Sequence, residues 1–176
     1  MKALVLTSKE DGVVYHADYP TPTAKTGEVR IKVLAAALNH RDVWIMQGQY
    51  AGIKYPTILG SDGVGIVDSV GEGVSADWLN KTVIINPNNE WGDKQRHQTK
   101  QYHILGLPKD GTLAEFVTVD ADKVRLAPAH LTIEQAAALS GVSISAFVLE
   151  HAYQAARRVI LEQQQIQSFN QATSNK

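Results

Sequence analysis

Two short polar clusters carry the side chains of this chain that are best suited to chemistry. The first is Asn39-His40-Arg41-Asp42, and the second is Ser61-Asp62, which lies between Gly60 and Gly63. An asparagine amide can donate a hydrogen bond that polarises a carbonyl oxygen, and glycines let a backbone approach another group closely. We expect the two clusters to meet at one cleft, with the rest of the chain folded as a barrel around them.

The same residue types also allow purely structural roles. Asn39 and Asp42 are typical of a capped helix start, and by residue type alone this role is favoured over contact with a ligand. The Tyr50 hydroxyl can donate to a carbonyl, and a half-buried loop tyrosine is about equally plausible. His40 can carry a proton, although a surface position is the commoner one. Ser61 lacks the Gly-x-Ser-x-Gly elbow, so it is not expected to be a nucleophile.

The composition fits a globular domain and excludes several classes of function. The chain has 176 residues, of which 44% are hydrophobic and 20% charged, and its formal net charge is -1. There is no basic excess that would favour nucleic acid. The absence of cysteine excludes disulfides, cysteine-ligated zinc and a thiol nucleophile. The first apolar run is too short for a signal peptide or a membrane span, so we expect a cytoplasmic location and no membrane partner.

Short apolar runs separated by turn residues predict a mainly β fold. The second run returns from the first through a two-residue hairpin at Asp11-Gly12. Residues 39–48 favour a short helix, and residues 86–110 favour a long irregular loop. Many short strands with turns between them indicate a closed or nearly closed barrel. The expected strands are residues 2–6, 13–15, 29–38, 63–70, 81–86, 111–119 and 123–126.

A helical pattern replaces the strand pattern from Thr132 onward. Thr132 and Gln135 form a capping box before an alanine-rich helix. A second helical stripe comprises Leu149, Tyr153, Ala156 and Ile160. We therefore expect a barrel domain over residues 1–131, helices over 132–166 and a disordered tail over 167–176. Because the apolar helix faces need cover, we expect a homodimer through residues 132–161.

Several short motifs occur in a specific order over residues 1–147. They are Gly27-Glu28-Val29, Asn39-His40-Arg41-Asp42, Gly60-Ser61-Asp62-Gly63-Val64-Gly65, Val70-Gly71-Glu72-Gly73-Val74, Asp110-Gly111-Thr112-Leu113-Ala114-Glu115-Phe116 and Ala136-Ala137-Ala138-Leu139. In this order they resemble the GroES-like catalytic domain of the medium-chain dehydrogenase/reductase family. The resemblance implies a GroES-like barrel with short helices and a C-terminal helical segment. No strand, glycine turn and helix follow residue 147, so we expect the family's Rossmann domain to be absent from this chain.

The resemblance also bears on the metal. Zinc alcohol dehydrogenases of this family place a cysteine at the Asn39 position, a histidine at the Ser61 position and a glutamate at the Asp62 position. Asparagine and serine are poor zinc ligands, so we expect no metal. The zinc-independent, quinone-reductase-like branch is similar in carrying an asparagine and a Gly-Ser-Asp there, and a cleft tyrosine at Tyr50. This similarity implies catalytic roles for Asn39 and Tyr50, and substrate or cofactor contacts for His40, Arg41, Asp42, Ser61 and Asp62.

The function implied by the resemblance is that of an NAD(P)H-dependent oxidoreductase, usually with NADPH, acting on a small molecule such as a quinone, enone or aldehyde. This chain would be its catalytic-domain portion, inactive without a nucleotide-binding domain and unable to bind NADPH tightly alone. The alternative is a non-catalytic β-barrel that binds a small molecule or a partner. The letters of Gly71-Glu72-Gly73-Val74-Ser75-Ala76 match a dinucleotide fingerprint, but too few residues follow for the required helix. We therefore expect a turn there.

Overall fold

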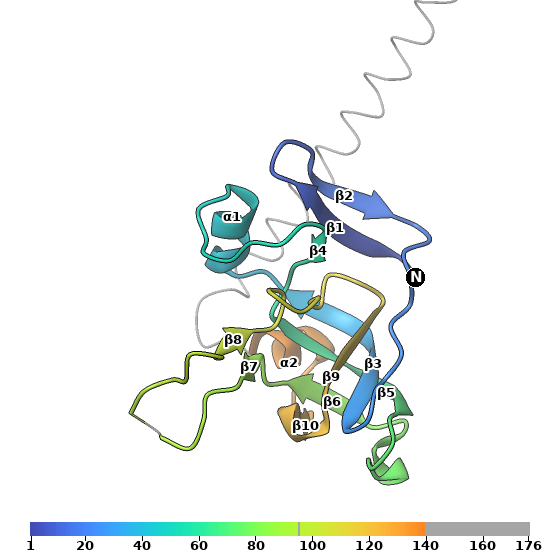
Figure 1. Ribbon diagram of the computed structural model, residues 1–176. Coiled ribbons are helices and arrows are strands. Elements are labelled where there is room, and N and C mark those ends of the chain that lie inside the picture. Colours follow the sequence, from blue (N-terminus) through green and yellow to red (C-terminus); the bar gives the residue numbers. More distant parts are fainter. Residues whose placement is uncertain (95, 140–176) are drawn as a thin grey trace, which may run out of the picture. The chain divides into compact units, whose positions relative to one another are not determined.

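The computed structural model describes residues 1–94 and 96–139 (Figure 1). All of its strand pairs are antiparallel. A three-stranded sheet has the order β2-β1-β4, with β2 at Gly12–His16, β1 at Ala3–Ser8 and β4 at Thr57–Ile58. A five-stranded sheet has the order β10-β6-β5-β3-β9, with β10 at Val124–Leu126, β6 at Thr82–Ile85, β5 at Asp62–Val70, β3 at Glu28–Ala37 and β9 at Phe116–Asp120. A two-stranded ribbon joins β7 at Asn88–Asn89 to β8 at His103–Ile104.

Four short helices complete the described part of the chain. Two are α-helices, α1 at His40–Met46 and α2 at Ile133–Leu139, and two are 3-10 turns, η1 at Ala76–Trp78 and η2 at Ala121–Lys123. The mainly β fold class expected from the sequence is confirmed. In the ranges that the structure describes, no helix has the length and hydropathy to cross a membrane.

The main core includes the apolar residues of β3, which alternate with polar ones along the strand. Val29 and Ile31 are fully buried, whereas Lys32 on the same strand is exposed, as expected for a sheet with one wet face. They pack with Val67 of β5 and Val83 of β6 in one apolar cluster. Each such side chain contributes about 1.5–3 kcal/mol when removed from water. This core holds β3 and β5 rigidly, and their ends carry the two polar clusters.

The segment around Leu113 joins the two larger sheets. The Leu4 amide donates to the Leu113 carbonyl at 2.9 Å, and the Glu115 amide donates to the Lys2 carbonyl at 2.9 Å. The Val33 amide of β3 donates to the Glu115 carbonyl at 2.9 Å. The expected strand over 111–119 is therefore wrong in its first half, because residues 111–115 bond to β1 and to the chain after β4 rather than continuing β9.

The first hairpin exists, although its turn differs from the expected one. Ser8 pairs with Gly12, so residues 9–11 form the loop and Asp11-Gly12 is not a two-residue turn. The Asp11 amide donates to the Ser8 hydroxyl oxygen at 2.9 Å, and this bond favours the longer loop. Gly12 has φ of +68°, which a glycine adopts without strain.

The stretch from Gly71 to Ala76 is a turn, as expected. It leads into the three-residue η1, which Ser75 caps by accepting from the Asp77 amide at 3.2 Å. A Cβ on Gly71 would lie 1.7 Å from the Lys25 carbonyl oxygen, so a close backbone approach requires this glycine. The glycines that resemble a dinucleotide-binding motif are therefore explained by this turn.

Helix α2 packs on its own barrel. Its capping box is confirmed, since the Thr132 amide donates to Gln135 Oε1 at 3.0 Å and the Gln135 amide donates to Thr132 Oγ1 at 3.2 Å. Ala136 and Ala137 are buried against Val64 of β5. The five-stranded sheet therefore covers this face of α2. The stripe over 149–160 and the tail over 167–176 lie outside the described residues, and the homodimer stays a prediction.

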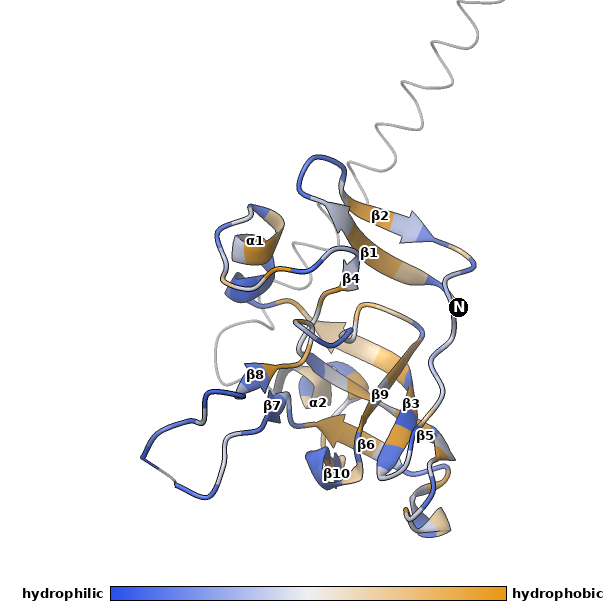
Figure 2. Ribbon diagram, in the orientation of Figure 1, coloured by the Kyte–Doolittle hydropathy of each residue, from blue (hydrophilic) through white to orange (hydrophobic). Residues whose placement is uncertain are grey.

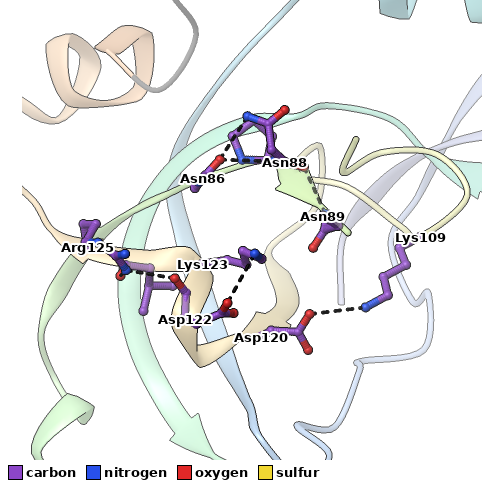
Figure 3. A network of polar contacts seen from close by, with 10 residues as sticks. Asn86, Asn88, Asn89, Lys109, Asp120, Asp122, Lys123 and Arg125 are labelled. Atoms are coloured by element: carbon purple, nitrogen blue, oxygen red, sulfur yellow. Dashed lines mark hydrogen bonds and ion pairs between the residues drawn. The ribbon is translucent and has the colours of Figure 1, made fainter. Parts of the chain in front are cut away.

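The long loop between β6 and β9 is irregular, as expected, apart from the β7–β8 ribbon. At its start, the Asn88 amide and Asn88 Nδ2 each lie 3.1 Å from Asn86 Oδ1, and Asn89 Nδ2 donates to the Pro87 carbonyl at 2.9 Å (Figure 3). At its end, Lys109 Nζ lies 3.8 Å from Asp120 on β9. Figure 2 shows that the stretch between β7 and β8 is largely hydrophilic. The Asn86 amide also donates to the Lys123 carbonyl at 2.7 Å, so both ends of the loop are bonded to the barrel.

Candidate functional site

Asp42 fixes helix α1 to the turn before β5. Its Oδ2 accepts from the Asn39 amide at 2.8 Å, and its Oδ1 accepts from the Gly60 amide at 3.2 Å. The side chain is buried, with 1% of its residue surface exposed. The structural role that the residue types favoured is therefore the one observed for Asp42. It also brings the two polar clusters together.

The Asn39 side chain makes the second link between the clusters. Asn39 Nδ2 donates to Asp62 Oδ2 at 2.6 Å, across the ends of β3 and β5. Asp62 is buried, and its backbone carbonyl accepts from Thr112 Oγ1 at 2.9 Å. An asparagine amide has two N–H groups, and the contact with Asp62 uses one of them. The expectation that the clusters meet is confirmed.

Arg41 places a positive charge against the buried serine. Its Nη1 donates to Ser61 Oγ at 2.9 Å and to the Leu105 carbonyl at 2.9 Å. Ser61 Oγ itself donates to the same carbonyl at 3.0 Å. The guanidinium carbon lies 5.2 Å from the centroid of the Tyr50 ring, a cation–π contact. Arg41 Nε is buried without a hydrogen-bond partner among the described residues.

The two buried carboxyl groups lie in an environment that disfavours their charge. Burial raises the pKa of Asp42, and hydrogen bonds from Asn39 and Gly60 together with the Arg41 charge oppose that rise. Burial also raises the pKa of Asp62; the Asn39 hydrogen bond and the Arg41 charge oppose the rise, whereas the Asp42 charge adds to it. Arg41 therefore offsets part of the cost of holding two carboxylates in one buried network.

Three glycines allow the backbones of the loops around this network to cross in direct contact. A Cβ on Gly111 would lie 2.0 Å from the Gly60 carbonyl oxygen, and one on Gly106 would lie 2.8 Å from it. Gly60 and Gly106 also have φ of +93° and +90°, where other residues are strained. The loops after β4, after β8 and before β9 therefore meet at one point, and the Gly111 amide donates to the Ile58 carbonyl there.

The remaining candidates lie nearer the surface. Tyr50 is 37% exposed, and no hydrogen bond of its hydroxyl occurs in the part of the chain that the structure describes. His40 is exposed, and its ring centroid lies 6.3 Å from that of Trp44. The structure thus brings Tyr50 to the network through Arg41 and leaves His40 outside it.

A pocket of about 500 Å³ opens beside Arg41 and Tyr50. Its other walls come from residues 51–54 and from the long loop at 98–108. Tyr102 in this wall donates its hydroxyl to Asn88 Oδ1, and its ring packs edge-on against Trp91 at 5.1 Å. Burial raises the pKa of Tyr102, which favours the neutral phenol. Inspection of the sequence missed this wall, because the loop shows no periodicity.

Thr112 and the Leu105 carbonyl were also missed. Thr112 is buried and bonds to the Asp62 backbone, and Leu105 accepts from both Arg41 and Ser61. The only sequence signal for Thr112 is its place in the Asp110-Gly111-Thr112 motif, and a backbone carbonyl carries no signal at all.

Comparison with known families and proteins agrees with the geometry. The alcohol dehydrogenase GroES-like domain matches residues 25–129, more than half of the chain. The chain belongs to the medium-chain dehydrogenase/reductase family. A second model, antitoxin TacA 1-like, matches residues 123–175. Of that stretch, residues 123–139 hold β10 and α2, which pack in the family's barrel, and the rest lies outside the described residues.

Individual relatives are similar to this chain over less than half of their own length. Starvation-sensing protein RspB of Escherichia coli is 27% identical over 157 residues, which is 86% of this chain and 46% of that protein. Crotonyl-CoA carboxylase/reductase of Cereibacter sphaeroides is 33% identical over 129 residues, which is 66% of this chain and 30% of that protein. The crystal structure of an NAD-dependent alcohol dehydrogenase matches with a TM-score of 0.71 and 36% identity, over 78% of this chain and 43% of that one.

The residues present do not fit the catalytic zinc that part of the family binds. Zinc takes about three nitrogen, sulfur or carboxylate ligands. Here the Asn39 amide nitrogen is bonded to Asp62, and the Ser61 hydroxyl lies 2.9 Å from the Arg41 guanidinium, whose charge repels a cation. In residues 1–94 and 96–139, no group of three histidine, aspartate or glutamate side chains is placed to hold a metal ion.

Proposed function

We propose that this chain is the catalytic-domain portion of an NAD(P)H-dependent oxidoreductase of the zinc-independent, quinone-reductase-like type. Its substrate would be a quinone, an enone or an aldehyde. The observation that carries this proposal is the Arg41 guanidinium, held by Ser61 and Leu105 against Tyr50 at the edge of an open pocket. The name of the crotonyl-CoA carboxylase/reductase, a reductase, supports a reduction.

The chemistry of the site follows from charge. A reduced nicotinamide, when bound, supplies the hydride. Addition of hydride to a carbonyl carbon, or to the far carbon of a conjugated alkene, leaves negative charge on the carbonyl oxygen. The Arg41 charge and the Tyr50 hydroxyl are placed to stabilise that oxygen, and a proton from solvent completes the reduction. An organic cation thus does what a metal does in other members of the family.

The other network residues would position these groups. Asp42 fixes α1, and with it Arg41, to the Gly60 turn. Asp62 orients the Asn39 amide, whose second N–H can donate to a substrate carbonyl. We keep Asn39 and Tyr50 as candidate catalytic residues on this basis. Contact of His40 with a cofactor stays a prediction.

NADPH is the expected cofactor, and its nucleotide part would be held outside the described residues. The fingerprint-like stretch at 71–76 is a turn followed by a three-residue 3-10 helix, which offers no helix N-terminus to a pyrophosphate. We therefore expect no tight binding of NADPH by this chain alone. A cytoplasmic location likewise stays an expectation.

Substitution of Arg41 and Tyr50 in the whole natural protein tests the proposal. Oxidation of NADPH is followed with a quinone, an enone and an aldehyde. Arg41→Met and Tyr50→Phe should each lower kcat by about 10²- to 10³-fold, the usual effect of removing one oxyanion donor. Arg125→Met, which removes an exposed arginine on β10, is the matched control.

Two comparisons separate chemistry from folding. Arg41→Lys keeps the charge and should retain more turnover than Arg41→Met at a similar thermal midpoint. Tyr50 is 37% exposed, so its phenylalanine variant should fold normally. Full kcat in both Arg41→Met and Tyr50→Phe would refute the proposed roles. Ligand binding without any turnover in the wild type would instead favour the non-catalytic binding module.

A further inference from the structure

The pocket beside Arg41 has a strongly one-sided charge. Its walls include Arg41, Lys54 and Lys100, and no aspartate or glutamate among the described residues lines it. This bias is local, since the whole chain has 17 lysines and arginines against 18 aspartates and glutamates. A ligand in this pocket would therefore meet cationic groups on several sides.

The two lysines are free to bind a ligand. Within the described ranges, neither Lys54 nor Lys100 forms an ion pair. Both residues are exposed, one on the segment after α1 and the other on the long loop. A lysine ammonium has three N–H donors and no acceptor, so a bound anion would gain charge-assisted hydrogen bonds from each.

Arg41 has unused donor capacity on the same side of the site. Only Nη1 of its guanidinium donates in the part of the chain described here, to Ser61 and to Leu105. Its Nε is buried without a partner in that part, and an unsatisfied buried donor is costly. The Tyr50 ring against the guanidinium limits its freedom to move. An acceptor brought into the pocket would meet this arginine and two exposed lysines.

The size of the pocket favours an organic ligand over a simple ion. Its volume of about 500 Å³ falls within the range of small-molecule sites. Aromatic and aliphatic side chains, among them Tyr102, Ile104 and Leu107, supply apolar wall between the charges. The walls therefore suit a molecule that carries both an anionic group and a carbon framework.

We propose that this pocket binds an anionic group, a phosphate or a carboxylate, of an organic ligand. Lys54 and Lys100 would bind the anion, and Arg41 would face the part of the ligand nearest the Ser61 network. The assignment of this ligand as the substrate rests on the proposed function, whereas anion binding itself does not. A substrate bound in this way would place its reactive carbonyl near Arg41 and its anionic group toward the long loop.

Titration of the whole 176-residue chain with two probes tests this proposal without cofactor or turnover. The probes are inorganic pyrophosphate and succinate, measured by calorimetry at constant ionic strength. We compare Lys54→Gln/Lys100→Gln with a matched double variant, Lys32→Gln/Lys81→Gln, which removes two exposed lysines elsewhere. All four lysines are exposed, so equal thermal midpoints are expected and should be verified.

The expected result is saturable binding of one probe to the wild type and to the matched variant, weakened about tenfold or more in the pocket variant. Preference for pyrophosphate would indicate a phosphate-bearing ligand, and preference for succinate a carboxylate-bearing one. Failure of both probes to saturate, or equal weakening in the two double variants, would overturn the proposal. These titrations do not measure hydride transfer. If the protein binds a probe but shows no reductase activity, the proposed function fails and the anion site stands.

Discussion

Arg41 connects the chemistry of the site to its stability. It bonds to Ser61 and to the Leu105 carbonyl, and its charge lowers the cost of burying Asp42 and Asp62. A substitution of Arg41 therefore changes turnover and stability together. The neighbouring carboxyl groups therefore offer a cleaner way to measure the electrostatics of the network.

Asp62→Asn should become more stabilising relative to the wild type as the pH rises. Burial raises the pKa of Asp62 in the folded protein above its unfolded value, so the folded state binds the proton more tightly. That contribution is fully present below the unfolded pKa and is lost as the pH rises through the folded pKa. Asparagine keeps an acceptor oxygen for Asn39 and removes the charge.

Denaturant unfolding from about pH 4 to about pH 7 measures this difference. Asp93→Asn, at an exposed position, is the matched control and should show no such divergence. Curves for the wild type and Asp62→Asn that stay parallel over this range would contradict the account.

At the scale of elements, the site depends on three loops that cross at glycines. The loops after β4 and β8 and the segment before β9 have their backbones in contact at Gly60, Gly106 and Gly111. Such crossings leave no room for a methyl group unless the backbone moves. The loops hold Ser61 and the Leu105 carbonyl, so their separation would also move Arg41.

Gly111→Ala should therefore destabilise the fold by about 3 kcal/mol or prevent folding, as in severe overpacking. Its Cβ would lie 2.0 Å from the Gly60 carbonyl oxygen. Gly52→Ala is the control, because a Cβ there meets nothing within 4 Å. Its only cost is the backbone strain of an alanine at a φ of +70°. Chemical denaturation compares the two variants. Equal losses would show that the loops adjust to each other more easily than we infer.

Sequence patterns predicted the elements better than the connections between them. Alternation identified β3, and the capping box at Thr132 and Gln135 identified the start of α2. Both signals are local, so neighbouring residues suffice to read them. The split of residues 111–119 could not be predicted, because bonds to β1 and to the chain after β4 decide it.

The site was predictable in part for the same reason. Asn39 and Asp62 lie at the ends of β3 and β5, and the glycines around Asp62 indicated a close approach. Lys54 and Lys100 were not predictable, because exposed lysines in loops are ordinarily solvated. Only the folded loops place them in the wall of one pocket.

At the scale of the whole molecule, the barrel is one part of a larger functional unit in its relatives. The chain spans 46% of RspB and 43% of the NAD-dependent alcohol dehydrogenase. In its described part, the chain supplies a polar network and a pocket. Under the proposed function, side chains of this chain, and not a metal, would polarise the substrate for hydride transfer.

Turnover after removal of metal tests whether a side chain or a metal polarises the substrate. The whole natural protein is dialysed against a chelator, its zinc content is measured, and NADPH oxidation is followed with an enone. Our expectation is far less than one zinc per chain with turnover unchanged, because Arg41 supplies the positive charge at the Ser61 position. Turnover that disappears with the zinc and returns when zinc is added back would contradict it.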